Sequence, residues 1–221
     1  MDGLKIAVQF LFFEEPRDAL VSRGGVSLDR LPEGARVGTS SLRRRSQLLH
    51  HRRDLVLEDI RGNVDTRLRK LDEGRYDAIV LAACGLIRLE LESRITERLD
   101  IERMLPEPGQ GALAVEIRDD DANAREAAAT LDDSVSRACV EAERAFLHAL
   151  GGGCRVPIAA YALARQGELE LDGAVIAADG SARLRDRLSG PIAEPIALGE
   201  RLANRLIARG AKNLLSQTPS S

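Results

Sequence analysis

Three hydroxyl side chains followed by two guanidinium groups mark the turn after residue 38. These residues are Thr39, Ser40, Ser41, Arg43 and Arg44. The stretch 35–38 has the pattern of a short strand, and hydroxyl residues are preferred helix N-caps, so we predict a helix over 42–52. Backbone N–H groups at a helix start, hydroxyls and arginines can together hold a carboxylate or a phosphate. Such caps and exposed arginines also occur without any ligand, so this turn alone leaves both interpretations open.

A second turn of the same kind contains Arg61, Gly62 and Arg67. It follows an alternating stretch, 55–60, and precedes a predicted helix over 64–73. Open α/β sheets bind ligands at the C-terminal ends of their strands, so two such turns predict a site for a ligand with several carboxylates or a phosphate. Residues 36–75 hold eleven basic and six acidic side chains in a chain of net charge −3. A solvated face and a nucleic-acid-binding patch are the alternatives.

The three cysteines, Cys84, Cys139 and Cys154, differ in context. Their odd number and the lack of a Cys-x-x-Cys pair argue against a disulfide framework and fit a reducing compartment. Cys84 follows an apolar run and Cys139 lies on the apolar stripe of a predicted helix, so both are expected in the core. Cys154 follows three glycines and precedes an arginine that favours its thiolate, so we predict that it alone carries chemistry. No spacing indicates a metal site.

Composition narrows the class of protein. A chain of 221 residues with 44% hydrophobic and 30% charged residues is typical of a folded globular protein. Aromatic residues make up 3% and tryptophan is absent, so few side chains could stack on single-stranded nucleic acid. The apolar run 6–13 is too short to span a bilayer and lacks the flanks of a signal peptide. We expect a cytoplasmic protein that binds neither nucleic acid nor membranes.

The order of predicted elements indicates two kinds of architecture. Short apolar runs alternate with helical patterns in the first half, which predicts an α/β region with a mainly parallel sheet. A helical stripe then ends at three glycines, and strands over 156–164, 168–176 and 182–188 precede a helix over 195–210. Strands in succession followed by a helix predict an α+β domain. The run 6–13 has no strand before it, so we expect an uncovered apolar edge there.

Several motifs resemble the porphobilinogen deaminase (hydroxymethylbilane synthase) family. Residues 143–147 (ERAFL) and 151–157 (GGGCRVP) resemble the sequence around that family's cofactor-bearing cysteine. Segments 15–19, 38–44, 61–67, 76–82 and 109–112 resemble other family segments, in the family's order. The resemblance extends from about residue 14 to the final helix. It implies periplasmic-binding-protein-like α/β domains and a C-terminal α+β domain. The implied division is 1–16 with 106–132 as the remnant of a first domain, 17–105 as a second, and 133–221 as the domain carrying the cysteine loop.

The resemblance also implies a function. In this family a dipyrromethane cofactor is bound through a thioether to the cysteine that Cys154 matches. The enzyme, a transferase of heme biosynthesis, condenses porphobilinogen stepwise into a linear tetrapyrrole and releases ammonia. Each pyrrole ring carries an acetate and a propionate group. The residues implied to bind the cofactor and its carboxylates are Cys154, Thr39, Ser40, Ser41, Arg43, Arg44, Arg61, Gly62, Arg67 and Gln110.

The sequence departs from the family's pattern at the beginning of the chain. The family's first domain starts before the segment matched here and supplies a catalytic aspartate, so no catalytic acid is assigned. We therefore expect impaired turnover, with a monomer if the chain is complete and association if it is truncated. The alternative function is a non-catalytic binding module for a polycarboxylate or a phosphorylated small molecule.

Overall fold

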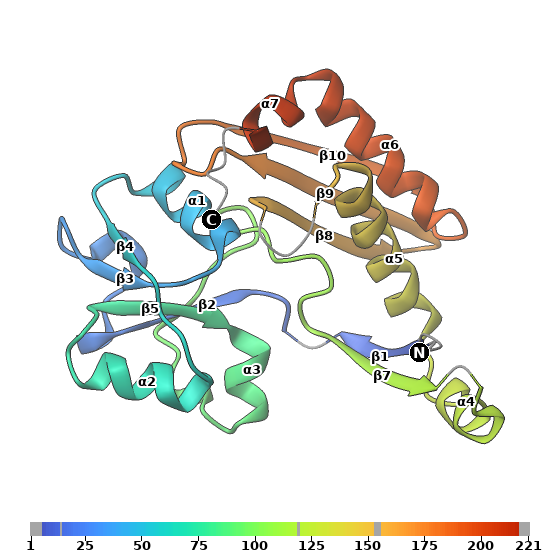
Figure 1. Ribbon diagram of the computed structural model, residues 1–221, viewed down its shortest axis with the longest axis horizontal. Helices are drawn as coiled ribbons and strands as arrows, with labels where there is room; N and C mark the ends of the chain where they lie inside the picture. Colours follow the sequence, from blue (N-terminus) through green and yellow to red (C-terminus); the bar gives the residue numbers. More distant parts are fainter. Residues whose placement is uncertain (1–5, 14, 119, 153–155, 217–221) are drawn as a thin grey trace, which may run out of the picture.

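The computed structural model describes residues 6–13, 15–118, 120–152 and 156–216, which form three separate sheets (Figure 1). The largest sheet has the strand order β4-β3-β5-β2-β6. Its strands are β2 (Asp18–Ser22), β3 (Arg36–Gly38), β4 (Val56–Glu58), β5 (Ala78–Ala82) and β6 (Glu97–Arg98). Its helices are α1 (Leu42–His51), α2 (Val64–Asp72) and α3 (Ala83–Arg88), with 3-10 turns η1 (Arg23–Gly25), η2 (Leu28–Arg30) and η3 (Glu92–Arg94).

Helices cover both faces of this five-stranded sheet. On one face Leu20 and Val80 pack with Leu48 of α1, and on the other Ile79 packs with Leu68 of α2. Strands β3, β4 and β5 are parallel, whereas β2 is antiparallel to both β5 and β6. The predicted parallel sheet is therefore correct for three strands. The antiparallel pairing of β2 with β6 was not predicted, because β6 has only two residues, too few to form a sequence pattern.

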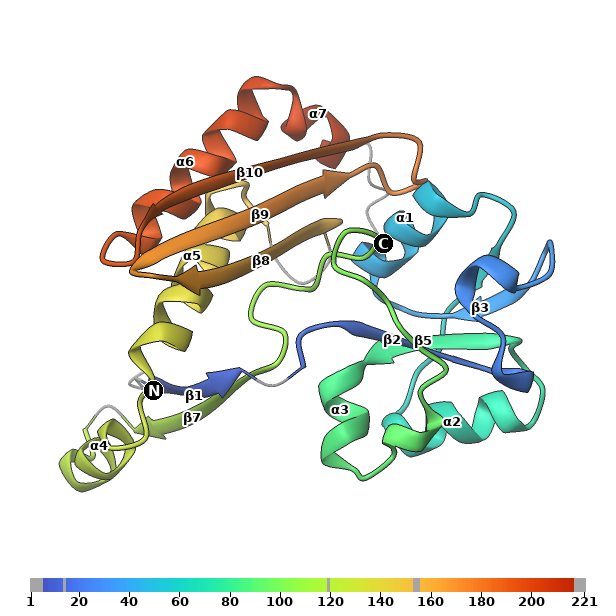
Figure 2. The same cartoon turned by 180° about the vertical axis from the view of Figure 1, so that it is seen from behind.

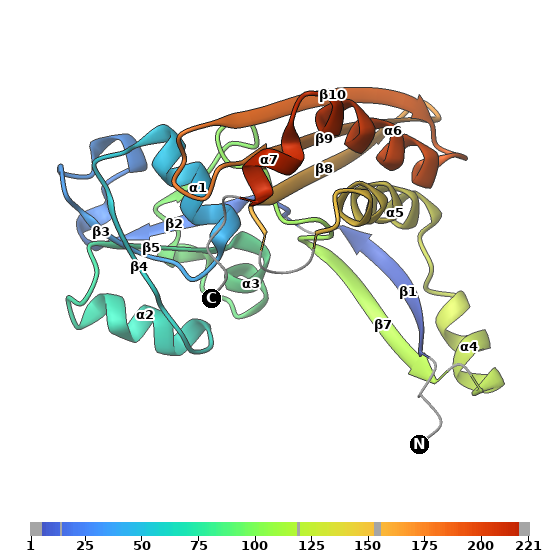
Figure 3. The ribbon, with the colours of Figure 1, turned by 45° about the horizontal axis from the view of Figure 1, so that its top comes forward.

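The second sheet is a two-stranded antiparallel ribbon of β1 (Ile6–Phe13) and β7 (Ala112–Arg118), followed by helix α4 (Ala122–Ala129). Ile6 lies opposite Arg118, so the whole five-stranded unit is inserted between the two strands (Figure 3). The sequence predicted an uncovered apolar edge at β1. Strand β7 pairs with one edge of β1 from far along the chain, and among the described residues no strand pairs with the other. Local sequence patterns carry no information about a partner at that distance.

The third sheet has the antiparallel order β10-β9-β8 and belongs to the predicted α+β region. Its elements are α5 (Ser134–Ala149), β8 (Ile158–Arg165), β9 (Glu168–Ile176), β10 (Arg183–Pro191), α6 (Pro195–Ala208) and α7 (Ala211–Ser216). Helices α5 and α6 lie on one face of this sheet, as Figure 2 shows from behind. They pack around the buried Phe146. On the other face Leu105, from the segment before β7, packs against Ala159 and Ala174.

Glycines allow the close packing of this third unit. A Cβ atom on Gly173 would lie 2.6 Å from the Phe146 ring, and one on Gly199 would lie 2.3 Å from the Ala142 carbonyl oxygen. Helices α5 and α6 can therefore approach each other only with glycine at position 199. Within the described residues no helix has both the length and the apolar character needed to cross a bilayer.

Candidate functional site

The two predicted anion-binding turns lie side by side at the C-terminal ends of β3 and β4. The Ser40 hydroxyl joins them, because its Oγ donates to the Ile60 carbonyl oxygen at 2.8 Å and accepts from the Ile60 N–H at 3.0 Å. Thr39 is 1% exposed, and its Oγ1 accepts from the Ser41 N–H at 3.3 Å. Thr39 and Ser40 therefore stabilise the two turns through hydrogen bonds to the backbone of these turns.

Ser41 and Asn63 begin the helices of the two turns. The Ser41 Oγ accepts from the Arg44 N–H at 3.5 Å, and the Asn63 Oδ1 accepts from the Thr66 N–H at 2.9 Å. Both are N-cap contacts, which satisfy backbone donors at a helix start. Ser41 is half-buried and also lines a cavity.

Arg43 and Arg44 are buried and share one carboxylate. Arg43 Nη1 lies 2.7 Å from Asp18 Oδ2, and Arg44 Nε donates to Asp18 Oδ1 at 2.9 Å. Asp18 is fully buried, and although burial raises its pKa, the charges of the two arginines outweigh burial and hold the pKa below its usual range. Because two guanidinium groups face one carboxylate, the cluster of Arg43, Arg44 and Asp18 has a net positive charge.

Gln110 completes this network from the segment before β7. Its Nε2 donates to the Pro16 carbonyl oxygen at 2.6 Å and to Asp18 Oδ1 at 3.1 Å. Its Oε1 accepts from Arg43 and from Arg44, each at 3.4 Å. Sequence reasoning included Gln110 and missed Asp18. A charged residue inside the otherwise apolar stretch 18–21 is the signal that could have identified it.

The second turn adds further positive charge. Arg67 Nε donates to the Gly62 carbonyl oxygen at 2.8 Å, and Lys70 Nζ donates to the Arg61 carbonyl oxygen at 2.8 Å. Gly62 has φ +120°, and a Cβ there would lie 2.6 Å from the Thr66 side chain, so the turn requires glycine. The Arg61 side chain is exposed.

The pKa of Arg67 is lower than that of an ordinary arginine. Burial and the nearby charge of Arg44 both lower the pKa of Arg67. Each effect disfavours its positive charge, and no acidic group offsets them among the causes of the shift. An anion bound between Arg44 and Arg67 would relieve this repulsion.

A cavity of about 160 Å³ lies where α1, the segment before β7 and the third unit meet. Its lining residues are Ser41, Arg43, Glu107, Pro108, Arg144, Leu147, Val156 and Ile158. Within the described residues, the buried Nε of Arg43 makes no hydrogen bond. Val156 follows Cys154 by two positions in the chain. Cys154 itself lies outside the described residues.

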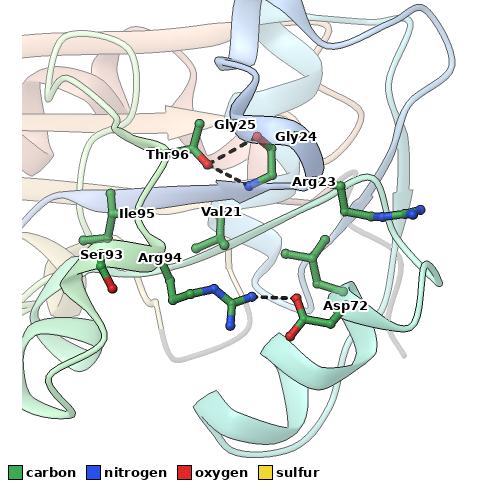
Figure 4. Close-up of a pocket in the computed structure, with 11 residues that line it drawn as sticks. Val21, Arg23, Gly24, Gly25, Asp72, Ser93, Arg94, Ile95 and Thr96 are labelled. Atoms are coloured by element: carbon green, nitrogen blue, oxygen red, sulfur yellow. Dashed lines mark hydrogen bonds and ion pairs between the residues drawn. The ribbon is translucent and has the colours of Figure 1, made fainter.

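A larger cavity, of about 590 Å³, lies at the other end of the strands of the five-stranded sheet, beside the last residues of β2 (Figure 4). Arg94 there pairs with Asp72 at 2.6 Å, and the Ser22 N–H donates to Thr96 Oγ1 at 3.0 Å. These polar groups satisfy one another. The smaller cavity is lined by Arg43, whose Nε makes no hydrogen bond within the described residues, so it is the better candidate for a ligand site.

The two cysteines expected in the core differ in burial. Cys139 is 3% exposed, and burial raises the pKa of its thiol to about 12, which fits the core role predicted for it. Cys84 is only half-buried, at the start of α3, so its predicted core position holds only in part. Arg144 of α5, in the motif ERAFL, lines the smaller cavity and was not singled out from the sequence. Among the described residues no group of His, Cys, Asp and Glu side chains is arranged to hold a metal ion.

The fold and the site together define an α/β protein with a cationic surface at the C-terminal ends of its parallel strands. Residues 1–126 match the family model "Porphobilinogen deaminase, dipyromethane cofactor binding domain". Residues 137–208 match the model "Porphobilinogen deaminase, C-terminal domain". This chain therefore belongs to the porphobilinogen deaminase family.

Curated relatives support the same assignment. The porphobilinogen deaminase of Syntrophotalea carbinolica is 50% identical over 203 residues, which cover 92% of this chain and 64% of that protein. The one from Pelobacter propionicus is 51% identical, with coverage of 92% and 66%. The one from Roseiflexus castenholzii is 54% identical, with coverage of 91% and 66%. The chain thus spans about two thirds of the length of these relatives.

Proposed function

We propose that this chain provides the cofactor- and substrate-binding surface of a hydroxymethylbilane synthase, a transferase that condenses porphobilinogen into a linear tetrapyrrole with release of ammonia. The observation that carries the proposal is the pairing of two arginines, Arg43 and Arg44, with a single acid, Asp18, while the charge of Arg44 also acts on Arg67. Porphobilinogen and its oligomers carry an acetate and a propionate on every ring, so their binding requires an excess of cations.

The residues present fit a dipyrromethane cofactor. Among the described residues the buried Nε of Arg43 has no hydrogen-bond partner, and Arg44 and Arg67 repel each other. Both observations favour a bound anion with several carboxylates. We propose that Ser41, Arg43, Arg44 and Arg67 would hold these carboxylates, with the exposed Arg61 at the rim. Thr39, Ser40 and Gly62 would act by fixing the turns, and Gln110 by orienting the arginines.

The covalent link is proposed for Cys154, as a thioether. When bound, the dipyrromethane supplies the nucleophilic pyrrole carbon to which each porphobilinogen unit is added. This chain's own residues would neutralise the carboxylates and hold the rings beside the cavity. Val156, two positions after Cys154, supports this placement because it lines the cavity. No catalytic acid is assigned.

Two further expectations belong to the same proposal. The pairing of β1 with β7 supports the domain division into 1–16 with 106–132, 17–105 and 133–221. The three cysteines, odd in number and without a Cys-x-x-Cys pair, support a cytoplasmic location.

Intact-mass spectrometry tests the covalent link. The purified chain is incubated with porphobilinogen, alongside the variants Cys154→Ser, Cys84→Ser and Cys139→Ser. We expect a mass increase of pyrrole units on the parent chain and on the last two variants, and none on Cys154→Ser. An adduct on Cys154→Ser would refute the assignment of that residue, and an unmodified parent chain would contradict the cofactor proposal.

A non-catalytic binding module for polycarboxylates or phosphorylated molecules is the second candidate. It is favoured by the net positive charge of the Asp18 network, which binds anions whether or not turnover follows. Reversible citrate binding without any adduct would select this alternative.

A further inference from the structure

Two buried acids from different units hold two neighbouring residues of one connecting segment. Glu143 of α5 accepts the Gly109 N–H at 2.6 Å, and Asp18 of β2 accepts from the Gln110 side chain at 3.1 Å. The other Glu143 oxygen accepts the Ala162 N–H of β8 at 2.7 Å. Residues 105–111 thus connect the third unit to the arginine cluster.

The backbone around Gln110 needs an external anchor. Gly109 and Gly111, on either side of it, have φ +80° and +89°. Glycine reaches these angles readily but also leaves them readily, because it lacks the restraint of a side chain. The bond from Gly109 to Glu143 fixes this turn against α5.

The Gln110 amide can face the arginines in one orientation only. Its Nε2 donates to the Pro16 carbonyl oxygen at 2.6 Å, so its Oε1 is turned toward Arg43 and Arg44. The reverse orientation would place N–H groups against two guanidinium groups and an oxygen against a carbonyl. Displacement of the turn would therefore change what the arginines contact.

Glu143 has a role in this arrangement that the core does not require. It is 1% exposed, and its carboxylate oxygens accept hydrogen bonds from two backbone N–H groups. Burying a carboxyl group among backbone donors costs stability relative to an apolar side chain of similar size. What it provides is a fixed position for Gly109.

We propose that Glu143 is a positioning residue for the anion-binding arginines and acts on them through Gly109 and Gln110. This inference rests on the proposed function, because it concerns the same site. It assigns the motif ERAFL a task in ligand binding at a distance.

The test uses the side-chain Nε–H signals of Arg43 and Arg44 in chain labelled with [15N]arginine. We expect Glu143→Gln and Gln110→Ala to shift both signals, and the double variant to shift them no further than Gln110→Ala does. Glu141→Gln, on the same helix, is the control and should leave both signals in place. Unchanged arginine signals in Glu143→Gln would overturn the proposal, even if its melting temperature falls.

A second variant covers the case in which Glu143→Gln does not fold. Glu143→Asp keeps the carboxylate but is one methylene shorter, so it cannot reach both N–H groups, and it should shift the same two signals. Citrate serves as the binding probe, and we expect about tenfold weaker binding by either variant, the size of a typical coupling between neighbouring residues. If the signals shift but the parent chain does not bind citrate, the proposed function fails and the positioning role stands.

Discussion

Asp18 determines what the arginine pair can do. A buried guanidinium without a counter-ion is unfavourable, and Asp18 serves two of them at once. The sequence places two arginines after an N-cap, which suggests side chains turned toward a ligand. In the structure both arginines pair with the buried carboxylate of Asp18. This single negative charge does not compensate two positive charges, and an anionic ligand can pair with the excess.

Replacing Asp18 by Asn should be strongly destabilising. It leaves Arg43 and Arg44 buried without a countercharge, which costs about 3–5 kcal/mol in the free energy of unfolding. Urea denaturation measures this. Asp29→Asn, which removes an exposed acid paired with His51 and Arg103, is the control and should cost about 1 kcal/mol or less. Equal effects of the two substitutions would contradict the role given to Asp18.

Arg67 and Arg69 on helix α2 provide a matched pair for the ligand site. Arg67 is partly buried and close to Arg44, whereas Arg69 is exposed and lies near Glu73. Arg67→Gln should weaken citrate binding by about ten- to a hundredfold, because a charged hydrogen bond contributes about 1.5–3 kcal/mol. Arg69→Gln should change it little. Titration calorimetry decides, and similar losses for both would mean that the cluster is only a charged face.

The acidity of Glu143 gives a prediction about pH. Burial raises its pKa to about 8, from 4.5 in an unfolded chain. Between these two pH values the folded state holds one more proton than the unfolded state, on Glu143. The contribution of this proton to the free energy of unfolding is therefore complete below about pH 4.5 and is lost as the pH rises toward 8. The free energy of unfolding should fall by about 1.4 kcal/mol per pH unit in this window.

The variant Glu143→Gln isolates this effect. Its neighbours Cys139 and Tyr161 have raised pKa values and titrate above this window. The difference between parent and variant should therefore slope with pH between about 5 and 8. A difference that is flat across this range would show that the buried group is not the source.

At the scale of elements, the sequence predicted what local pattern determines. The helices α1 and α2, the cap of α1 and the strands of the third sheet were predicted within a few residues, because capping and alternation are encoded locally. The antiparallel strands β2 and β6 and the pairing of β1 with β7 were not predicted. Those pairings depend on contacts between distant segments, which no periodicity reports.

The same reasoning separates the site residues that could be predicted from those that could not. Residue types at the two turns indicated anion binding, but not whether Ser40 would face a ligand or join the turns. Nor could spacing show that Glu143 lies beside Gly109, since the two residues are far apart in the chain. Geometry of this kind comes from tertiary packing alone.

At the scale of the whole molecule, the third unit has a core of its own. Phe146, Leu171 and Leu202 are fully buried within it. A fragment of residues 134–216 should therefore unfold cooperatively on heating, as followed by circular dichroism. Its midpoint should lie below that of the full chain, because Ala159 and Ala174 would lose the cover of Leu105. A fragment without a cooperative transition would show that its core depends on the rest of the chain.

The insertion of the five-stranded unit between β1 and β7 affects how the protein emerges from the ribosome. Strand β1, with the sequence IAVQFLFF, is made before its partner β7, which begins at Ala112. At ordinary synthesis rates of roughly 5–20 residues per second, β1 waits about 5–20 seconds for β7. During that interval this apolar strand lacks the partner it has in the folded chain, so β1 is where we expect chaperones to bind during translation.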